Sequence, residues 1–254
     1  EDEMTIKEKL IVHPGIRGIL FHVGSTNYFS LEPRFSMQYN WTDRWETKAS
    51  YTLMSQYIHQ LGSSTMNMPT DLWVPVSDDV KPMKSHQCVL GVYFHPCVRW
   101  HFSLEGFYKT QNHLLDDYNG VDITPEYADW KENVHSGKGH SYGLEWMGQK
   151  TGGKTNGWIN YTLSRAYRWF PDGSINQGQR FPAKYDSRHI LNLVLLHKFS
   201  NFFDISATWT FNNGFYTTQP LERYDTPTYL PGEKGEEKKD IIFHIEKRNN
   251  MKTP

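Results

Sequence analysis

The feature that most constrains this sequence is a two-residue alternation of apolar and polar side chains, which recurs in eight stretches. A strand gives this period because its successive side chains point to opposite faces of a sheet. Weaker strands are expected at 16–23 and from Asp240 onward. The sequence therefore predicts an all-β, antiparallel protein whose sheet has one apolar and one polar face. The eight expected strands are 29–39, 45–53, 88–94, 100–109, 141–146, 159–164, 191–195 and 203–211.

The connections between these strands alternate in length. Short connections at 40–44, 95–99, 150–156 and 199–202 are each followed by a long one, ending near residues 84, 138, 187 and 240. Up-and-down strands with short connections at one end and long ones at the other are typical of outer-membrane barrels. A soluble sandwich with Greek-key crossings would mix the two kinds of connection. The expected fold is therefore a segment of an up-and-down transmembrane β-barrel, with strands of about ten residues.

Composition agrees with a barrel and excludes other classes. Aromatic residues make up 15% of the chain, including nine Trp and fifteen Tyr, while the mean hydropathy is -0.68. No stretch approaches the roughly 18 apolar residues that a membrane-spanning helix needs, whereas only alternate residues of a barrel wall meet lipid. The net charge of -1 gives no argument for a nucleic-acid partner.

Two groups of side chains indicate how the sheet would lie in a membrane. Aromatic residues beside the short turns predict an interface girdle, and charged residues on the polar face predict a water-filled lumen. The girdle residues are Tyr39, Trp41, Trp45, Trp100, Trp158, Phe202 and Phe203. The lumen residues are Glu32, Arg34, Glu46, Lys48, Glu105, Lys109 and Glu145.

Five segments, in order and spacing, resemble the TonB-dependent outer-membrane receptor family, and together they cover most of the chain from about residue 28 to 212. They are similar to strand openings and one extracellular loop of that family's barrel. One departure is Ile190, where the family usually has an acidic residue, so the local charge pairing is not expected to follow the family. The segments are Tyr28–Arg34, Pro69–Pro75, Gly137–Glu145, Gly157–Ser164 and Phe181–His189.

The resemblance implies a barrel of 22 strands, of which this chain supplies about nine or ten as one partial domain, 1–254. Neither a plug domain, closing strands nor a signal peptide is expected here, so the fragment should form an open, curved sheet. The implied function is active uptake of a scarce nutrient across the outer membrane, driven through TonB, without catalysis or cofactor. The implied partners are membrane lipids, TonB, an unknown nutrient and, as in some relatives, a surface lipoprotein.

Aromatic residues in the long connections are candidate ligand contacts. They could stack on a sugar or a chelate, or equally pack the long loops against one another. The charged stretch 233–240 is expected to be a solvated loop tip. The candidates are Trp73, Tyr118, Trp130, Tyr167, Trp169 and Tyr216.

Three other motifs are predicted to have structural roles. The segment Gly148–Thr155 satisfies the phosphate-loop pattern, but the alternation that follows it excludes the required helix, so we expect a glycine-rich turn. His135 and His140 share an expected loop without a third metal ligand. Cys88 and Cys97 are expected on adjacent strands, too far apart for a disulfide.

Two rival classes remain open at this point. One is another outer-membrane barrel, such as a passive porin, and the other is a soluble all-β carbohydrate-binding or hydrolytic module. The direction of the apolar rows separates the soluble module from a barrel, because its rows would point into a closed core. The diagnostic residues are Leu31, Phe35, Leu104, Leu144 and Trp209.

Overall fold

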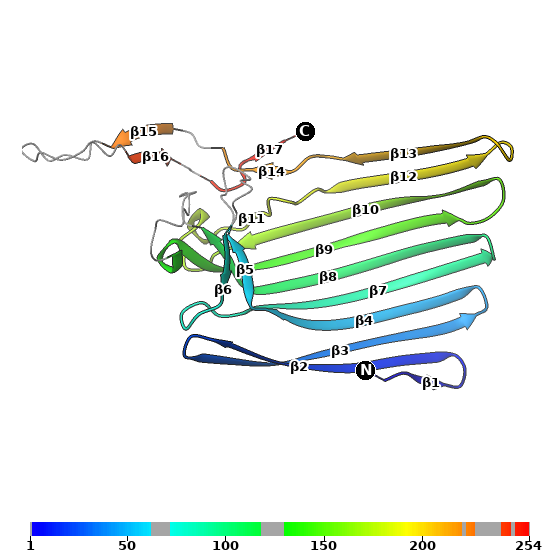
Figure 1. Ribbon diagram of the computed structural model, residues 1–254, viewed down its shortest axis with the longest axis horizontal. Coiled ribbons are helices and arrows are strands. Elements are labelled where there is room, and N and C mark those ends of the chain that lie inside the picture. The colour runs from blue at the N-terminus through cyan, green and yellow to red at the C-terminus, as the bar shows by residue number, and fades with distance from the viewer. Residues whose placement is uncertain are drawn as a thin grey trace, which may run out of the picture.

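The computed structural model describes residues 2–61, 72–117, 130–219, 222–226, 240–244 and 247–253. Its main element is an antiparallel sheet in which successive long strands lie side by side (Figure 1). Among the described residues, no helix has the length and apolar character needed to span a membrane. The strands, in spatial order, are β1 (Met4–Ile6), β2 (Leu10–Val23), β3 (Thr26–Thr42), β4 (Trp45–Gln56), β7 (Met83–Cys97), β8 (Trp100–Asp117), β9 (Val134–Lys150), β10 (Thr155–Trp169), β12 (His189–Lys198) and β13 (Asp204–Asn212).

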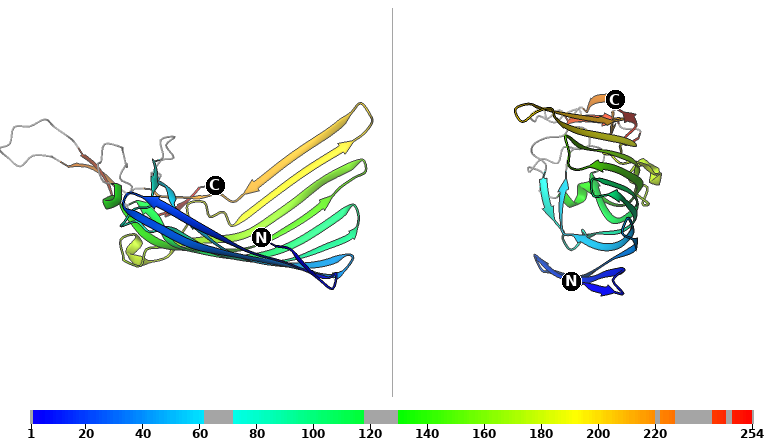
Figure 2. Two further views of the ribbon diagram at one scale, coloured as in Figure 1. Left: turned by 60° about the horizontal axis from the view of Figure 1, so that its bottom comes forward. Right: turned by 90° about the vertical axis from the view of Figure 1, so that its right-hand side faces the viewer.

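The sheet is curved and does not close on itself, as the end-on view in Figure 2 shows. Strands β1 and β13 form its two edges. The expectation of an open, curved sheet with nine or ten strands of a larger barrel is therefore confirmed. The remaining elements are β5 (Ile58–Leu61), β6 (Leu72–Pro75), β11 (Phe181–Pro182), β14 (Tyr216–Thr217), β15 (Glu222–Thr226), β16 (Asp240–His244), β17 (Met251–Lys252), η1 (Trp130–Asn133) and η2 (Asn176–Gly178).

Connection length is sorted by end, as predicted. Tight turns join strands at one end of the sheet, which we call the turn end, and the longer connections gather at the opposite, loop end (Figure 1). One connection at the loop end departs from this rule, because residues 24 and 25 alone join β2 to β3. Gly24 has a φ of 57°, a conformation that glycine adopts without steric cost, which permits this tight hairpin.

The outward direction of the apolar rows is confirmed. Strand register places the diagnostic residues on one face, which we call the outer face, and all of them are exposed. This finding contradicts a soluble module with a closed core, because the sheet buries no apolar row at its centre. The exposed fractions are 52% for Leu31, 41% for Phe35, 51% for Leu104, 51% for Leu144 and 53% for Trp209.

Aromatic rings on the outer face form a band near the turn end. Trp45 stacks on Phe94 with ring centroids 4.3 Å apart, and Trp100 stacks on Phe102 at 5.7 Å. Counting both ends, Trp100 to Tyr108 is nine residues along β8. This number matches the roughly 9–11 residues with which a tilted strand crosses hydrocarbon, so the stretch from Trp100 to Tyr108 has the length of one membrane crossing.

Several details differ from the sequence predictions. Many strands exceed ten residues, since β8 has 18 and β9 has 17, and they extend past the hydrocarbon span. Cys88 and Cys97 both lie in β7, because the strand continues through Pro96 with a bulge; both thiols are free. Asp240 does begin a strand, β16, but that strand pairs with β15 outside the main sheet.

Two further corrections concern side chains near strand ends. Trp158 lies opposite Gln149, so the register places it on the polar inner face and not in the outer aromatic band. His135 and His140 lie within β9 and not in a loop, because β9 begins at Val134. The alternation in this part of the sequence is weakened by glycine, which hid the start of the strand.

Candidate functional site

The polar face of the sheet, which we call the inner face, carries the charged side chains that the sequence predicts for a lumen. The β5–β6 hairpin contacts this face, so it lies on the concave side of the sheet (Figure 2). Charged side chains inside a membrane protein face water or one another, because hydrocarbon does not solvate them. The inner face is therefore the candidate passage, and the connections above it at the loop end are the candidate capture site.

A ladder of ionic, cation–π and hydrogen-bond contacts crosses the inner face from β4 to β8. Lys48 Nζ lies 3.0 Å from Glu46 Oε1 and 4.5 Å from the centre of the Tyr93 ring. The Tyr93 hydroxyl donates to Glu105 Oε1 at 2.9 Å. On the next strand, Glu145 stands directly opposite Glu105. The three carboxylates of Glu46, Glu105 and Glu145, with one lysine, give this part of the inner face an excess of negative charge.

A second inner-face cluster lies nearer the loop end, where β3 and β4 separate. Their ladder ends at the pair Arg34–Thr52, although β3 continues to Thr26. Glu32 fills the gap: its side chain, 1% exposed, accepts hydrogen bonds from Arg17 Nε at 2.8 Å and from the backbone N–H of Ser55 at 2.7 Å. The carboxylate thus supplies an acceptor where the strand ladder has stopped.

The β5–β6 hairpin docks on the inner face above this gap. The Tyr57 ring stacks on Phe21 with centroids 4.9 Å apart, and its hydroxyl is 2.5 Å from Ser30 Oγ. The Tyr28 hydroxyl donates to the carbonyl of Ser77 at 2.5 Å. The hairpin also buries His59, and burial lowers the pKa of its imidazole below the ordinary value. These contacts hold the hairpin against the inner face.

The connection between β10 and β12 forms the other packed part of the loop end. Phe170 is fully buried with Leu114, Ile175 and Phe181. A Cβ at Gly137 would come within 2.5 Å of the Phe170 ring, so only glycine permits this packing. The aromatic and aliphatic side chains give the connection a small core of its own.

Ion pairs tie this same connection to the strands. Asp186, 2% exposed, accepts from Arg165 Nη1 at 3.1 Å and from the backbone N–H of Ala166 at 2.8 Å. Burial alone would raise the pKa of Asp172, but hydrogen bonds from Ser174 and His135 lower it below the ordinary value. The connection is thereby fixed at both its apolar core and its charged groups.

The predicted ligand-contact residues are dispersed over this end of the molecule. Tyr118 lies outside the described residues. Trp73 in β6 is 61% exposed, and Trp130 in η1 is half-buried. These residues do not converge on one pocket within the described part of the chain.

The other three candidates gather near the end of β10. Tyr167 and Trp169 both contact His140, at 5.4 Å between ring centroids. The phenol of Tyr216 hydrogen-bonds to Arg165. The sequence analysis predicted Tyr167 and Trp169 in a loop. The structure places both in β10, and the strand register puts them on its outer face.

The structure bears on two alternative chemistries, nucleotide binding and metal binding. The Gly148–Thr155 segment ends β9, turns, and begins β10, so the phosphate-loop pattern is a hairpin turn as predicted. Within the described ranges, no group of three or more His, Cys, Asp or Glu side chains is arranged to hold a metal ion.

Comparison with known proteins identifies the architecture. A family model described as TonB dependent receptor-like, beta-barrel, matches residues 1–233. The Pseudomonas aeruginosa receptor FpvA, solved with a heterologous pyoverdine, is 14% identical at a TM-score of 0.60, covering 85% of this chain and 28% of FpvA. The alcaligin receptor FauA of Bordetella pertussis is 16% identical at a TM-score of 0.53, covering 83% and 36%.

A third similar structure is the FrpB iron transporter of Neisseria meningitidis, 13% identical at a TM-score of 0.55, covering 96% of this chain and 35% of FrpB. No curated protein sequence matches. The chain spans about a third or less of these receptors' length. With the family model matching most of the sequence and the sheet arranged as a barrel wall, the chain belongs to the TonB-dependent receptor-like β-barrel family of the bacterial outer membrane.

Proposed function

We propose that the protein imports a scarce nutrient actively, with energy supplied through TonB, and that the first ligand class to test is a ferric siderophore. The observation that carries this proposal is the division of the sheet into an apolar outer face and a charged inner face capped by packed loop-end connections. The ligand class is supported by similar structures, which include a ferripyoverdine receptor of Pseudomonas aeruginosa and a ferric-catecholate import receptor of Escherichia coli.

In the proposed mechanism, the loop-end connections capture the ligand and the inner face lines its passage. The Glu46–Lys48–Tyr93–Glu105 ladder would contact a plug domain and release it when TonB pulls. Hydrogen-bonded charges suit this role because water can replace each contact at little net cost in free energy. The barrel wall for this mechanism would be completed by parts of the protein beyond residues 1–254.

The test is uptake of iron-55 presented as hydroxamate or catecholate siderophores, by cells that carry the full-length protein as their sole receptor for these chelates. We expect accumulation that stops when TonB is deleted or the proton-motive force is collapsed. Uptake that continues unchanged in both conditions would indicate a passive porin. TonB-dependent uptake of a labelled oligosaccharide, with none of iron, would keep active transport and replace the proposed ligand class.

A charge substitution tests the passage itself. Lys48→Glu places a third acidic group beside Glu46 and Glu105, so we expect the uptake rate to fall about tenfold while ligand binding at the cell surface is unchanged. Lys154→Glu makes the same charge change at an exposed position in the turn between β9 and β10; it is the matched control and should leave uptake within twofold. Equal effects of the two substitutions would contradict a role for the ladder.

A further inference from the structure

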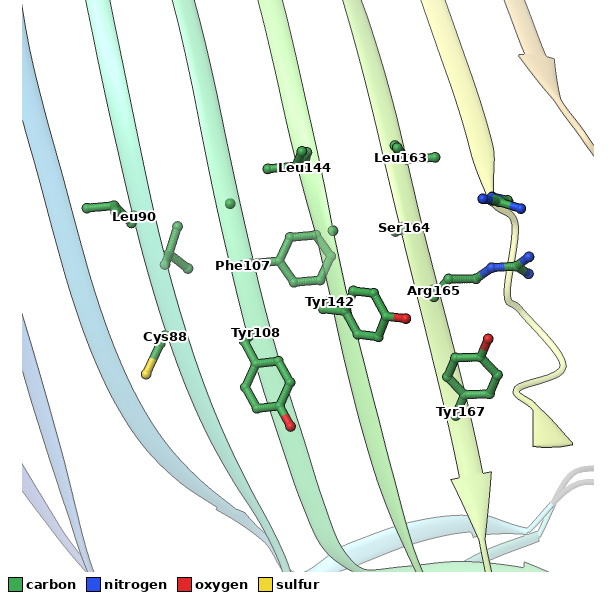
Figure 3. Close-up of a pocket in the computed structure, with 14 residues that line it drawn as sticks. Cys88, Leu90, Phe107, Tyr108, Tyr142, Leu144, Leu163, Ser164, Arg165 and Tyr167 are labelled. Carbon is green, nitrogen blue, oxygen red and sulfur yellow. The ribbon is translucent and has the colours of Figure 1, made fainter. Parts of the chain in front are cut away.

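A hollow of about 820 Å³ lies on the outer face, across β7, β8, β9 and β10 (Figure 3). Strand register arranges its lining in rows, because directly paired residues share a face. The row nearer the turn end is Leu90, Gly106, Leu144 and Leu163, and the next row is Cys88, Tyr108, Tyr142 and Arg165. The hollow thus passes from an apolar floor to a polar rim.

Gly106 creates the depth of the apolar row. Its neighbours Leu90 and Leu144 are more than half exposed and stand on either side of it. A Cβ at Gly106 would have Leu144 Cδ2 as its nearest neighbour at 3.4 Å, an ordinary van der Waals contact, so the missing side chain leaves a dip between the two leucines. The shape suits a hydrocarbon chain lying between two leucines.

The rim carries positive charge at the level of the membrane interface. Arg165 stands beside the apolar row of the outer face, and the buried Asp186 holds its guanidinium through Nη1 at 3.1 Å. A guanidinium has five N–H donors, so further donors can serve a second anion. Arg188 adds another guanidinium to the lining, giving the two arginines and Asp186 a net charge of +1.

We propose that this hollow binds a phosphorylated, multiply acylated glycolipid of the outer leaflet, with an acyl chain over Gly106 and a phosphate at Arg165 and Arg188. Longer connections of such barrels are extracellular, which places the rim in the outer leaflet. From Cys88 to Arg165 the polar row spans three inter-strand steps, or about 14 Å, wide enough for a disaccharide headgroup. The Tyr108 and Tyr142 hydroxyls supply neutral hydrogen bonds along the rest of the rim.

This proposal rests on the outer-membrane placement of the barrel and not on what it transports. The experiment titrates detergent-purified full-length protein with bisphosphorylated lipid A, dephosphorylated lipid A and phosphatidylglycerol, with bound lipid counted by native mass spectrometry. We expect bisphosphorylated lipid A to bind most tightly and dephosphorylation to weaken it. Equal affinity for phosphatidylglycerol would overturn the glycolipid assignment.

Two substitutions test the two ends of the hollow separately. Gly106→Leu fills the apolar floor and should weaken lipid A binding about tenfold, as expected if roughly two methylene groups lose their contacts. Arg188→Gln should weaken it about fivefold through loss of one basic group near the surface. Arg188 is substituted in place of Arg165 because Arg165 also holds Asp186. Loss of Arg165 would disturb the connection between β10 and β12.

Matched controls lie on the same sheet outside the hollow. Gly18→Leu places the same side chain on the outer face of β2, where a Cβ has room, and Arg99→Gln removes an exposed arginine at the turn end. Both should leave lipid A affinity within twofold. If Gly106→Leu and Gly18→Leu weaken binding equally, or if neither does, the hollow is not a lipid site. Siderophore uptake is measured on the same variants and is expected to be unchanged, so a failure of the lipid site can be told apart from a failure of the proposed transport.

Discussion

At the scale of single residues, Glu32 shows how a charge on the inner face supports the backbone. Replacing it with alanine leaves the N–H of Ser55 without its acceptor, so we expect the free energy of unfolding to fall by about 1–3 kcal/mol. Glu32→Gln keeps an oxygen for Ser55 and loses only the bond with the half-exposed Arg17, so it should cost less than about 1 kcal/mol.

Urea unfolding of the full-length protein in lipid bilayers, followed by tryptophan fluorescence, measures both losses. Arg17→Ala is the control for the ion pair: it keeps the acceptor for Ser55 but leaves the buried Glu32 carboxylate without its cation, so it should be more destabilising than Glu32→Gln, which removes the charge itself. A Gln variant as unstable as the Ala variant would show that charge, and not the backbone acceptor, is what Glu32 contributes.

At the scale of elements, the β5–β6 hairpin responds to pH through His59. Burial lowers the pKa of this imidazole below its ordinary value of 6.5, so the docked hairpin keeps it neutral. When the hairpin opens, His59 takes up a proton at any pH below about 6.5. The open form then binds more protons, so hairpin stability is full above that pH and declines as pH falls toward the lowered pKa.

Hydrogen exchange of the β5 and β6 backbone amides, corrected for the intrinsic effect of pH, measures this change. Protection should be lower at pH 5.5 than at pH 7.5. His59→Leu has a side chain of similar volume without a titrating group, so its protection should be independent of pH. A wild-type hairpin with equal protection at both pH values would contradict the argument.

The sequence predicts the long strands well and the docked elements poorly. Strands such as β3 and β8 are predictable because lipid on one side and water on the other impose alternation over many residues. β5 and β6 have only four residues each, and their position depends on Tyr57 meeting Phe21 and Ser30, contacts between distant parts of the chain. The face occupied by Tyr167 likewise depends on strand register.

At the scale of the whole molecule, both proposals require hydrocarbon outside the sheet and water inside it. Adjacent residues on β8 test this with one substitution each, in the full-length protein with Cys88 and Cys97 replaced by serine. A nitroxide attached to the thiol of Leu104→Cys lies on the outer face, and one attached to the thiol of Glu105→Cys lies on the inner face. Neighbouring residues of a strand point to opposite faces, so their surroundings should differ sharply.

Power-saturation EPR in lipid bilayers reports those surroundings through two relaxing agents. Oxygen concentrates in hydrocarbon and should relax the label at position 104 more strongly, whereas a water-soluble nickel chelate should relax the label at 105. Scanning 103–108 should reproduce the period of two, and oxygen accessibility should decline at Tyr108, where the apolar row gives way to phenols and guanidinium. A reversed or absent alternation would mean that lipid does not cover the face with the leucine rows, and both the transport and the lipid-site proposals would then lose their foundation.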